Sequence, residues 1–205
     1  MYKIIKPLIS AVAIALGFGG AVKAIPLEEQ ISKLDEIGLK MNAGLTVEDL
    51  LYSYDREEYE SAPFDLILLA YGSDVEREPW DRAICDRVWN FDGEFIEGDG
   101  SYIEIVERFS KVAGVSDQVS DIQDLVDFEN DIAWVSYKIN GKQKKYNALI
   151  DDDWADPKVI KSIMDDMLRK GYRFYAIDNG QASVWLHLNE SEANVLRRFN
   201  VKFLF

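Results

Sequence analysis

The residues best suited to chemistry in this sequence are carboxylates, and they gather in two places. One is the run 151–156, made of Asp151, Asp152, Asp153, Trp154, Ala155 and Asp156. The other lies in the glycine-containing stretch 91–104 and comprises Glu94, Glu97, Asp99 and Glu104. Such groups can ligate Ca²⁺, attract a basic partner, or stand solvated at the start of a helix. Neither group has the spacing of an EF-hand loop, so we expect no metal site.

A single histidine and a single cysteine restrict the remaining chemistry. His187 alone excludes every His-pair metal motif, and Cys85 alone excludes an intramolecular disulfide and a Cys-cluster metal site. A Cys–His hydrolase would require these two side chains within hydrogen-bond reach, and the sequence around Cys85 lacks a thiol-protease signature. Nucleophile-elbow, phosphate-loop and dinucleotide motifs are absent from the sequence. We therefore predict no catalytic residue and no cofactor.

Paired carboxylates leave one enzymatic alternative. Glycoside hydrolases place two carboxylates across the scissile bond, and aromatic rings often support the sugar. The chain contains 37 acidic residues and five tryptophans. A hydrolase acting on a glycan or peptide through acids near segments 80–102 or 151–156 therefore remains an alternative interpretation.

The charge of the chain indicates the kind of partner to expect. Lys and Arg number 23 against 37 Asp and Glu, a net charge of −14. Because the first 24 residues hold Lys3, Lys6 and Lys23 and no acid, removing them leaves 20 against 37, or −17. A surface this negative repels phosphate backbones, so nucleic-acid binding is disfavoured. A protein partner that is itself basic fits better.

Residues 1–24 have the layout of a secretory signal peptide. Lys3 and Lys6 precede fifteen uncharged residues, 8–22, and Val22-Lys23-Ala24 offers small residues where a signal peptidase cleaves. An uncleaved membrane anchor is the alternative, although it normally needs about 20 apolar residues. We expect a periplasmic or secreted protein, with no stable membrane insertion once this leader is removed.

The mature chain alternates helix and strand signals. Helices are predicted over 26–38, from Thr46, over 101–114 behind a Ser101/Glu104 capping box, over 156–170 behind Asp156, and after Asn189. The apolar run 64–71 predicts a buried strand, and 55–62 a charged connection. Loop is expected at 73–83, with further strands at 87–96, 122–129 and the terminal five residues.

Two Asn-Gly pairs predict the hairpins 133–150 and 172–188. In the first, facing residue numbers sum to 281, so Val135 is expected opposite Tyr146. In the second, a turn at Asn179-Gly180 would place His187 opposite Tyr172. The predicted class is α+β, with an antiparallel sheet built from these hairpins and packed with helices. A helical segment over 25–62, with two short helices, precedes a main α+β domain over 63–205.

From residue 46 onward the sequence resembles a group of acidic bacterial proteins to which no established activity is attached. The stretches that carry the resemblance are TVEDLLYSYDREEYESAPF (46–64), VEREPW (75–80), CDRVWNFDGEFIEGDGSY (85–102), VDFENDIAWVSYKINGK (126–142) and DDDWADP (151–157). The resemblance implies one acidic bacterial domain and transfers no catalytic residue.

Together these observations favour a binding protein over an enzyme. We expect an exported acidic protein that binds another macromolecule, in the manner of an immunity-type inhibitor of a cell-envelope toxin. The candidate partner-binding residues are Asp151, Asp152, Asp153, Trp154, Glu94, Glu97 and Asp99. A small-ligand or Ca²⁺-binding module is a third interpretation, beside the hydrolase.

Overall fold

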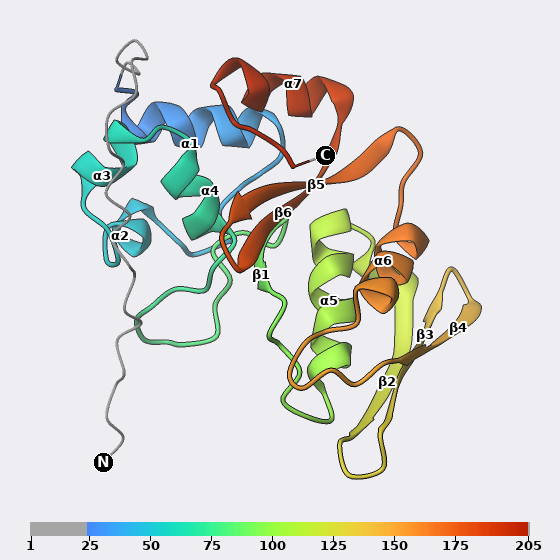
Figure 1. Ribbon diagram of the computed structural model, residues 1–205. Helices are drawn as coiled ribbons and strands as arrows, with labels where there is room; N and C mark the ends of the chain where they lie inside the picture. Colours follow the sequence, from blue (N-terminus) through green and yellow to red (C-terminus); the bar gives the residue numbers. More distant parts are fainter. Residues whose placement is uncertain (1–23, 205) are drawn as a thin grey trace, which may run out of the picture.

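The computed structural model describes residues 24–204, and these form helices and two three-stranded antiparallel sheets, which confirms the α+β class (Figure 1). The predicted leader, apart from Ala24, lies outside the described residues. The elements in chain order are α1 (Leu27–Glu36), α2 (Val47–Leu50), α3 (Arg56–Ser61), α4 (Asp65–Tyr71), β1 (Val88–Asp92), α5 (Ser101–Ala113), the 3₁₀ turn η1 (Ser116–Gln118), β2 (Val119–Asp127), β3 (Ile132–Ile139), β4 (Lys142–Ala148), α6 (Pro157–Asp166), β5 (Tyr172–Asn179), β6 (Ala182–Asn189) and α7 (Glu190–Arg198).

The two predicted hairpins lie in different sheets. Strands β3 and β4 join β2 in the order β2-β3-β4, and β5 and β6 join β1 in the order β1-β6-β5. The first hairpin has the predicted register, with Val135 opposite Tyr146. Its turn residues Asn140 and Gly141 both adopt positive φ, as a type I′ turn requires.

The predicted register of the second hairpin was wrong by two residues. Asn179 pairs with Ala182, so Gly180 and Gln181 form the turn, and His187 lies opposite Phe174 instead of Tyr172. Gly180 alone of the two turn residues has positive φ, which fits a type II′ turn with glycine at its first position. A shift of two residues leaves every side chain on its predicted face of the sheet.

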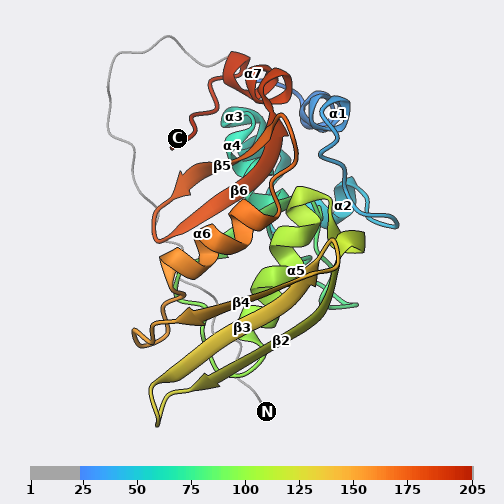
Figure 2. The same cartoon turned by 90° about the vertical axis from the view of Figure 1, so that its right-hand side faces the viewer.

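Two hydrophobic cores lie on opposite faces of sheet β1-β6-β5. Helices α1, α3, α4 and α7 contribute to the first core, on one face. Helices α5 and α6 contribute to the second, between the other face and sheet β2-β3-β4 (Figure 2). The layers therefore run helix, sheet, helix, sheet.

Strand β6 shows how one sheet serves both cores. Val184, Leu186 and Leu188 belong to the first core, and Trp185, between them, packs against the second. His187 lies on the same face as Trp185, because neighbouring residues of a strand point to opposite faces.

The predictions were wrong for three segments of the chain. The run 64–71, predicted as a strand, forms helix α4, and the predicted connection 55–62 holds helix α3. Leu and Ala, good helix formers, dominate the first segment, and an Asp55/Glu58 capping box starts the second. The terminal residues 201–204 form no strand; the Leu204 N–H donates one hydrogen bond to the Ala176 carbonyl.

The predicted capping box of helix α5 is also wrong. Gly100 is the residue before the helix, and the cap comes from Asp124 on β2. The Asp124 carboxylate accepts hydrogen bonds from the backbone N–H groups of Gly100, Tyr102 and Ile103 at 2.9–3.2 Å. The carboxylate satisfies the N–H groups that a helix start leaves unpaired, and it joins α5 to the second sheet.

Candidate binding surface

The two acidic segments meet in space. The carbonyl of Asp153 accepts hydrogen bonds from the N–H groups of Phe95 and Ile96, both at 2.9 Å. The Ala155 N–H donates to the Gly93 carbonyl at 2.9 Å, and Glu94 pairs with Trp154 in an isolated β-bridge. Segments about 60 residues apart in the sequence are therefore held side by side by backbone hydrogen bonds.

Four exposed carboxylates border this junction, and we call them the acidic lip: Glu94, Asp151, Asp152 and Asp153. Within residues 24–204, none of these side chains makes an ion pair or a hydrogen bond. The charges are thus unpaired and open to solvent. Such a group repels anions and attracts a cationic surface.

An apolar cavity of about 670 Å³, the Trp154 cavity, opens beside the acidic lip. Gly93 and Trp154, neighbours of Glu94 and Asp153, form one wall. Helix α6, the turn that follows it, and strands β1, β5 and β6 supply the rest, chiefly through Phe91, Ile160, Met164, Leu168, Phe174 and Trp185. Trp154 is 42% exposed and Leu168 48% exposed, so the apolar lining reaches the surface. Exposed large apolar side chains around a concavity are typical of binding sites.

The helix after the acidic run is held by Asp156, as predicted. Its carboxylate accepts a hydrogen bond from the Lys158 N–H at 2.8 Å, and from the Leu149 N–H at 2.9 Å. The Asp156 N–H donates to the Tyr102 hydroxyl at 3.0 Å. Asp156 is therefore buried and structural, and the three aspartates before it are left on the surface.

The remaining candidate residues of the second acidic group lie farther along the same loop. The Asp99 carboxylate accepts a hydrogen bond from the Val126 N–H at 2.7 Å, so it fixes the loop to β2. Glu97 is exposed, and its N–H donates to the Ser101 hydroxyl. With Glu94 and Glu104 they line a separate open hollow of about 620 Å³. No group of three or more His, Cys, Asp or Glu in residues 24–204 is placed to hold a metal ion.

His187 and Cys85 do not form a catalytic pair. Cys85 is buried in the first core together with Leu186 and Leu188, and His187 points to the opposite face of strand β6. Burial raises the pKa of the Cys85 thiol to about 11, which keeps it protonated. His187 is fully buried; its ring stacks on Tyr172 and packs at a tilt against Phe174.

The electrostatic surroundings of His187 also disfavour protonation. Burial lowers its pKa to about 4, and the nearby guanidinium groups of Arg169 and Arg87 add to the shift, which the Ala113 backbone opposes. Arg87 donates hydrogen bonds to the carbonyls of His187 and Val112. The arrangement is that of a packed neutral imidazole.

Comparison of the chain with protein-family models, curated proteins and solved structures finds no match. Among residues 24–204, no helix combines the length and apolarity that crossing a membrane requires.

The apolar half of this surface was not predicted from the sequence. Ile160, Met164 and Leu168 recur at helical spacing, a pattern typical of the buried face of a helix, yet all three line the Trp154 cavity. The usable signal was the position of Leu168 close to the helix end, next to the charged residues 169–170. The contribution of β1 and of the β5–β6 hairpin had no local signal, because it depends on sheet pairing.

Proposed function

We propose that this protein is an acidic binding protein whose acidic lip and Trp154 cavity together engage a basic protein partner. The observation that carries the proposal is the pairing of Gly93–Ile96 with Asp153–Ala155, which places unpaired carboxylates directly beside an apolar concavity. A partner segment with an apolar side chain flanked by Lys or Arg satisfies both features.

The cavity supports binding better than hydrolysis. Hydrolysis through paired carboxylates needs two of them facing one bond. Of the described residues that line the Trp154 cavity, Asp165 alone carries a carboxylate, and it pairs with Lys161. This surface therefore suits the binding of a partner, by shape and charge complementarity, better than hydrolysis.

The role that best accommodates these features is that of an exported immunity-type inhibitor, which neutralises a toxin in the cell envelope. The signal-peptide pattern of residues 1–24 supports export, and the mature charge of −17 supports rapid capture of a basic partner. Electrostatic capture of this kind weakens as salt is added.

Affinity capture from cell-envelope extracts tests the proposal. The bait is the mature protein, and the key variant combines Asp151→Asn, Asp152→Asn and Asp153→Asn. Asn suits position 152 well, because Asp152 has positive φ. The matched control removes three exposed charges from the N-terminal helices: Glu29→Gln, Asp35→Asn and Glu48→Gln.

We expect one basic protein to be captured by the wild type and the control at low salt, and to be released at high salt. The Asp151–Asp153 variant should lose most of this capture, and Trp154→Ala should weaken affinity by about 30-fold, as removal of an interface anchor does. Equal capture by all variants, or no specific partner at either salt concentration, would overturn the proposal.

A further inference from the structure

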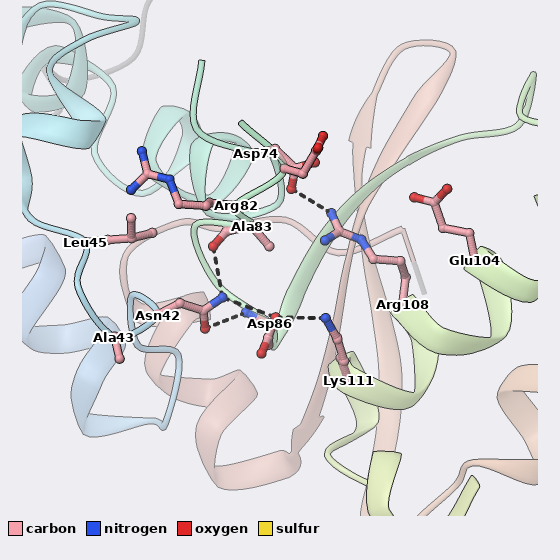
Figure 3. A pocket seen from close by; sticks show the side chains of 11 residues that line it. Asn42, Ala43, Leu45, Asp74, Arg82, Ala83, Asp86, Glu104, Arg108 and Lys111 are labelled. Atoms are coloured by element: carbon pink, nitrogen blue, oxygen red, sulfur yellow. Dashed lines mark hydrogen bonds and ion pairs between the residues drawn. The ribbon is translucent and has the colours of Figure 1, made fainter. Parts of the chain in front are cut away.

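A second, polar cavity lies between the N-terminal helices and α5. Its volume is about 670 Å³, and it shares no lining residue with the Trp154 cavity. Three parts of the chain form it: residues 42–45, the segment 74–86 between α4 and β1, and one face of α5 (Figure 3).

Helix α5 supplies charged side chains of both signs. Glu104, Arg108 and Lys111 are spaced at i, i+4 and i+7, so they project from one face of the helix. Figure 3 shows Arg108 and Lys111 extending toward the segment 74–86. The Arg108 guanidinium lies over the Trp89 ring, 5.7 Å from its centroid, which fixes its orientation.

The guanidinium of Arg108 uses only part of its hydrogen-bonding capacity among the described residues. Its guanidinium donates one long hydrogen bond, 3.4 Å, to the carboxylate of Asp74. The Arg108 side chain is 17% exposed and that of Asp74 52%, while the Arg108 Nε is buried without a partner among the described residues. A single long hydrogen bond leaves further N–H groups of the guanidinium able to donate to another carboxylate.

The opposite wall holds a positioned acid. The Asn42 side-chain amide donates to the Ala83 carbonyl at 2.9 Å and to the Asp86 carboxylate at 3.2 Å. The Asp86 N–H donates to the Asn42 side-chain oxygen in return. The Lys111 ammonium lies 3.7 Å from the Asp86 carboxylate, so this ion pair is loose and a ligand group can easily displace it.

The charge balance of the lining selects the ligand class. Three cationic residues face four acids: Arg82, Arg108 and Lys111 against Asp74, Asp81, Asp86 and Glu104. Arg82 points away from Arg108 toward Leu45 (Figure 3) and donates to the Pro79 carbonyl. A polyanion would meet repulsion from the acids, and a polycation from Arg108 and Lys111.

We propose that this cavity binds a small zwitterion, either a free α-amino acid or a short peptide through its two ends. The ligand carboxylate binds Arg108 and Lys111, and its ammonium group binds Asp74 and Asp86. The site is independent of partner binding at the acidic lip.

Calorimetric titration of the purified protein tests this assignment. The probes are alanine, leucine, glutamate, lysine and dialanine, with N-acetylalanine, alanine amide and inorganic phosphate as controls. We expect at least one zwitterion to bind, and its blocked analogues to bind about tenfold more weakly or not at all, since each lacks one of the two charges. No binding of any zwitterion at millimolar concentration, or equal binding of phosphate, would overturn the assignment.

Variants locate the site. Arg108→Gln and Lys111→Gln should each weaken zwitterion binding about tenfold or more, because each removes a charged hydrogen-bond donor. Arg56→Gln is the control, because Arg56 pairs with Glu28 on the N-terminal helices. If Arg108→Gln fails to fold, Lys111→Gln decides the question, since Lys111 is 45% exposed. Unchanged affinity in Lys111→Gln and in any folded Arg108 variant would place the ligand elsewhere and refute the proposal.

Discussion

The indole ring of Trp154 occupies the space that a side chain at residue 93 would need. A Cβ built on Gly93 would lie 2.8 Å from Cζ3 and 2.9 Å from Cε3 of the ring. The φ angle of Gly93 lies outside the left-handed region, so the glycine is required for space and not for conformation. The wall of the Trp154 cavity thus depends on the absence of a side chain at this position.

Gly93→Ala should displace the Trp154 ring and destabilise the protein by about 1–3 kcal/mol, the usual cost of overpacking. Chemical denaturation measures the change in unfolding free energy, and tryptophan fluorescence should shift to the red as the ring becomes more exposed. Partner capture should fall with it.

A double-mutant cycle with Trp154→Ala supplies the control. Once the ring is removed, the alanine at position 93 has room, so the double variant should be much less destabilised than the sum of the single variants. Additive effects would mean that the two residues do not contact each other as described.

Asp124→Ala should destabilise the protein by about 2 kcal/mol, because three backbone N–H groups at the start of α5 lose their acceptor. Asp124→Asn, which keeps one side-chain oxygen, should cost less. Asp117→Ala, at an exposed aspartate in η1, is the control and should leave stability nearly unchanged. Thermal unfolding followed by circular dichroism measures all three, and equal stability of Asp124→Ala and the control would contradict the capping role.

The stability of the protein should depend on pH through His187. Its pKa is about 4 in the folded chain against 6.5 in the unfolded one. The unfolded state therefore binds a proton first, and stability falls as the pH drops from 6.5 to 4, by about 3 kcal/mol in total. Below pH 4 both states are protonated and this loss is complete.

His187→Phe removes this titration. Because carboxylates also titrate near pH 4, the informative quantity is the difference in unfolding free energy between wild type and variant at each pH. That difference should shift in favour of the variant as the pH falls from 7 to 4. A difference that does not change with pH would show that His187 titrates normally.

The Asp166 carboxylate connects strands β3 and β4 to the end of helix α6. The hydroxyl groups of Tyr137 and Tyr146 donate to it at 2.9 and 2.7 Å, and Lys144 pairs with it. Burial, followed by the hydrogen bond to Asp166, raises the pKa of Tyr146 to about 12. Asp166→Asn should lower that pKa toward 10, since the negative neighbour is removed.

Ultraviolet absorbance titration of phenol ionisation measures this effect, and Tyr146→Phe assigns the transition to Tyr146. Asp117→Asn, at an exposed aspartate in η1, is the control, because Asp117 is not among the groups that shift the Tyr146 pKa. A Tyr146 pKa that is the same in wild type and Asp166→Asn would rule out the carboxylate as a cause of the shift.

Local signals in the sequence predicted much of the fold. The Asn140-Gly141 pair determined the first hairpin and its register, because few residues other than Asn and Gly tolerate positive φ at both turn positions. The prediction of a strand over 64–71 was wrong because a short apolar segment fits a buried helix as well as a buried strand. The cap of α5 could not be predicted, since Asp124 is more than 20 residues from the N–H groups it binds.

The candidate surface was predictable only in its parts. Both acidic segments stand out in the sequence, but their meeting depends on the hydrogen bonds between Gly93–Ile96 and Asp153–Ala155. Those bonds join segments that α5, η1 and strands β2, β3 and β4 separate in the sequence. Local spacing carries no record of such long-range pairing.

The position of sheet β1-β6-β5 between two hydrophobic cores determines how the protein unfolds. Leu186 and Trp185 are adjacent in β6, yet each belongs to a different hydrophobic core. Loss of strand β6 from the sheet would expose apolar surface of both hydrophobic cores at once. Neither core can therefore unfold while the other stays intact. We therefore expect calorimetry to record a single cooperative transition, with no half-unfolded species at equilibrium.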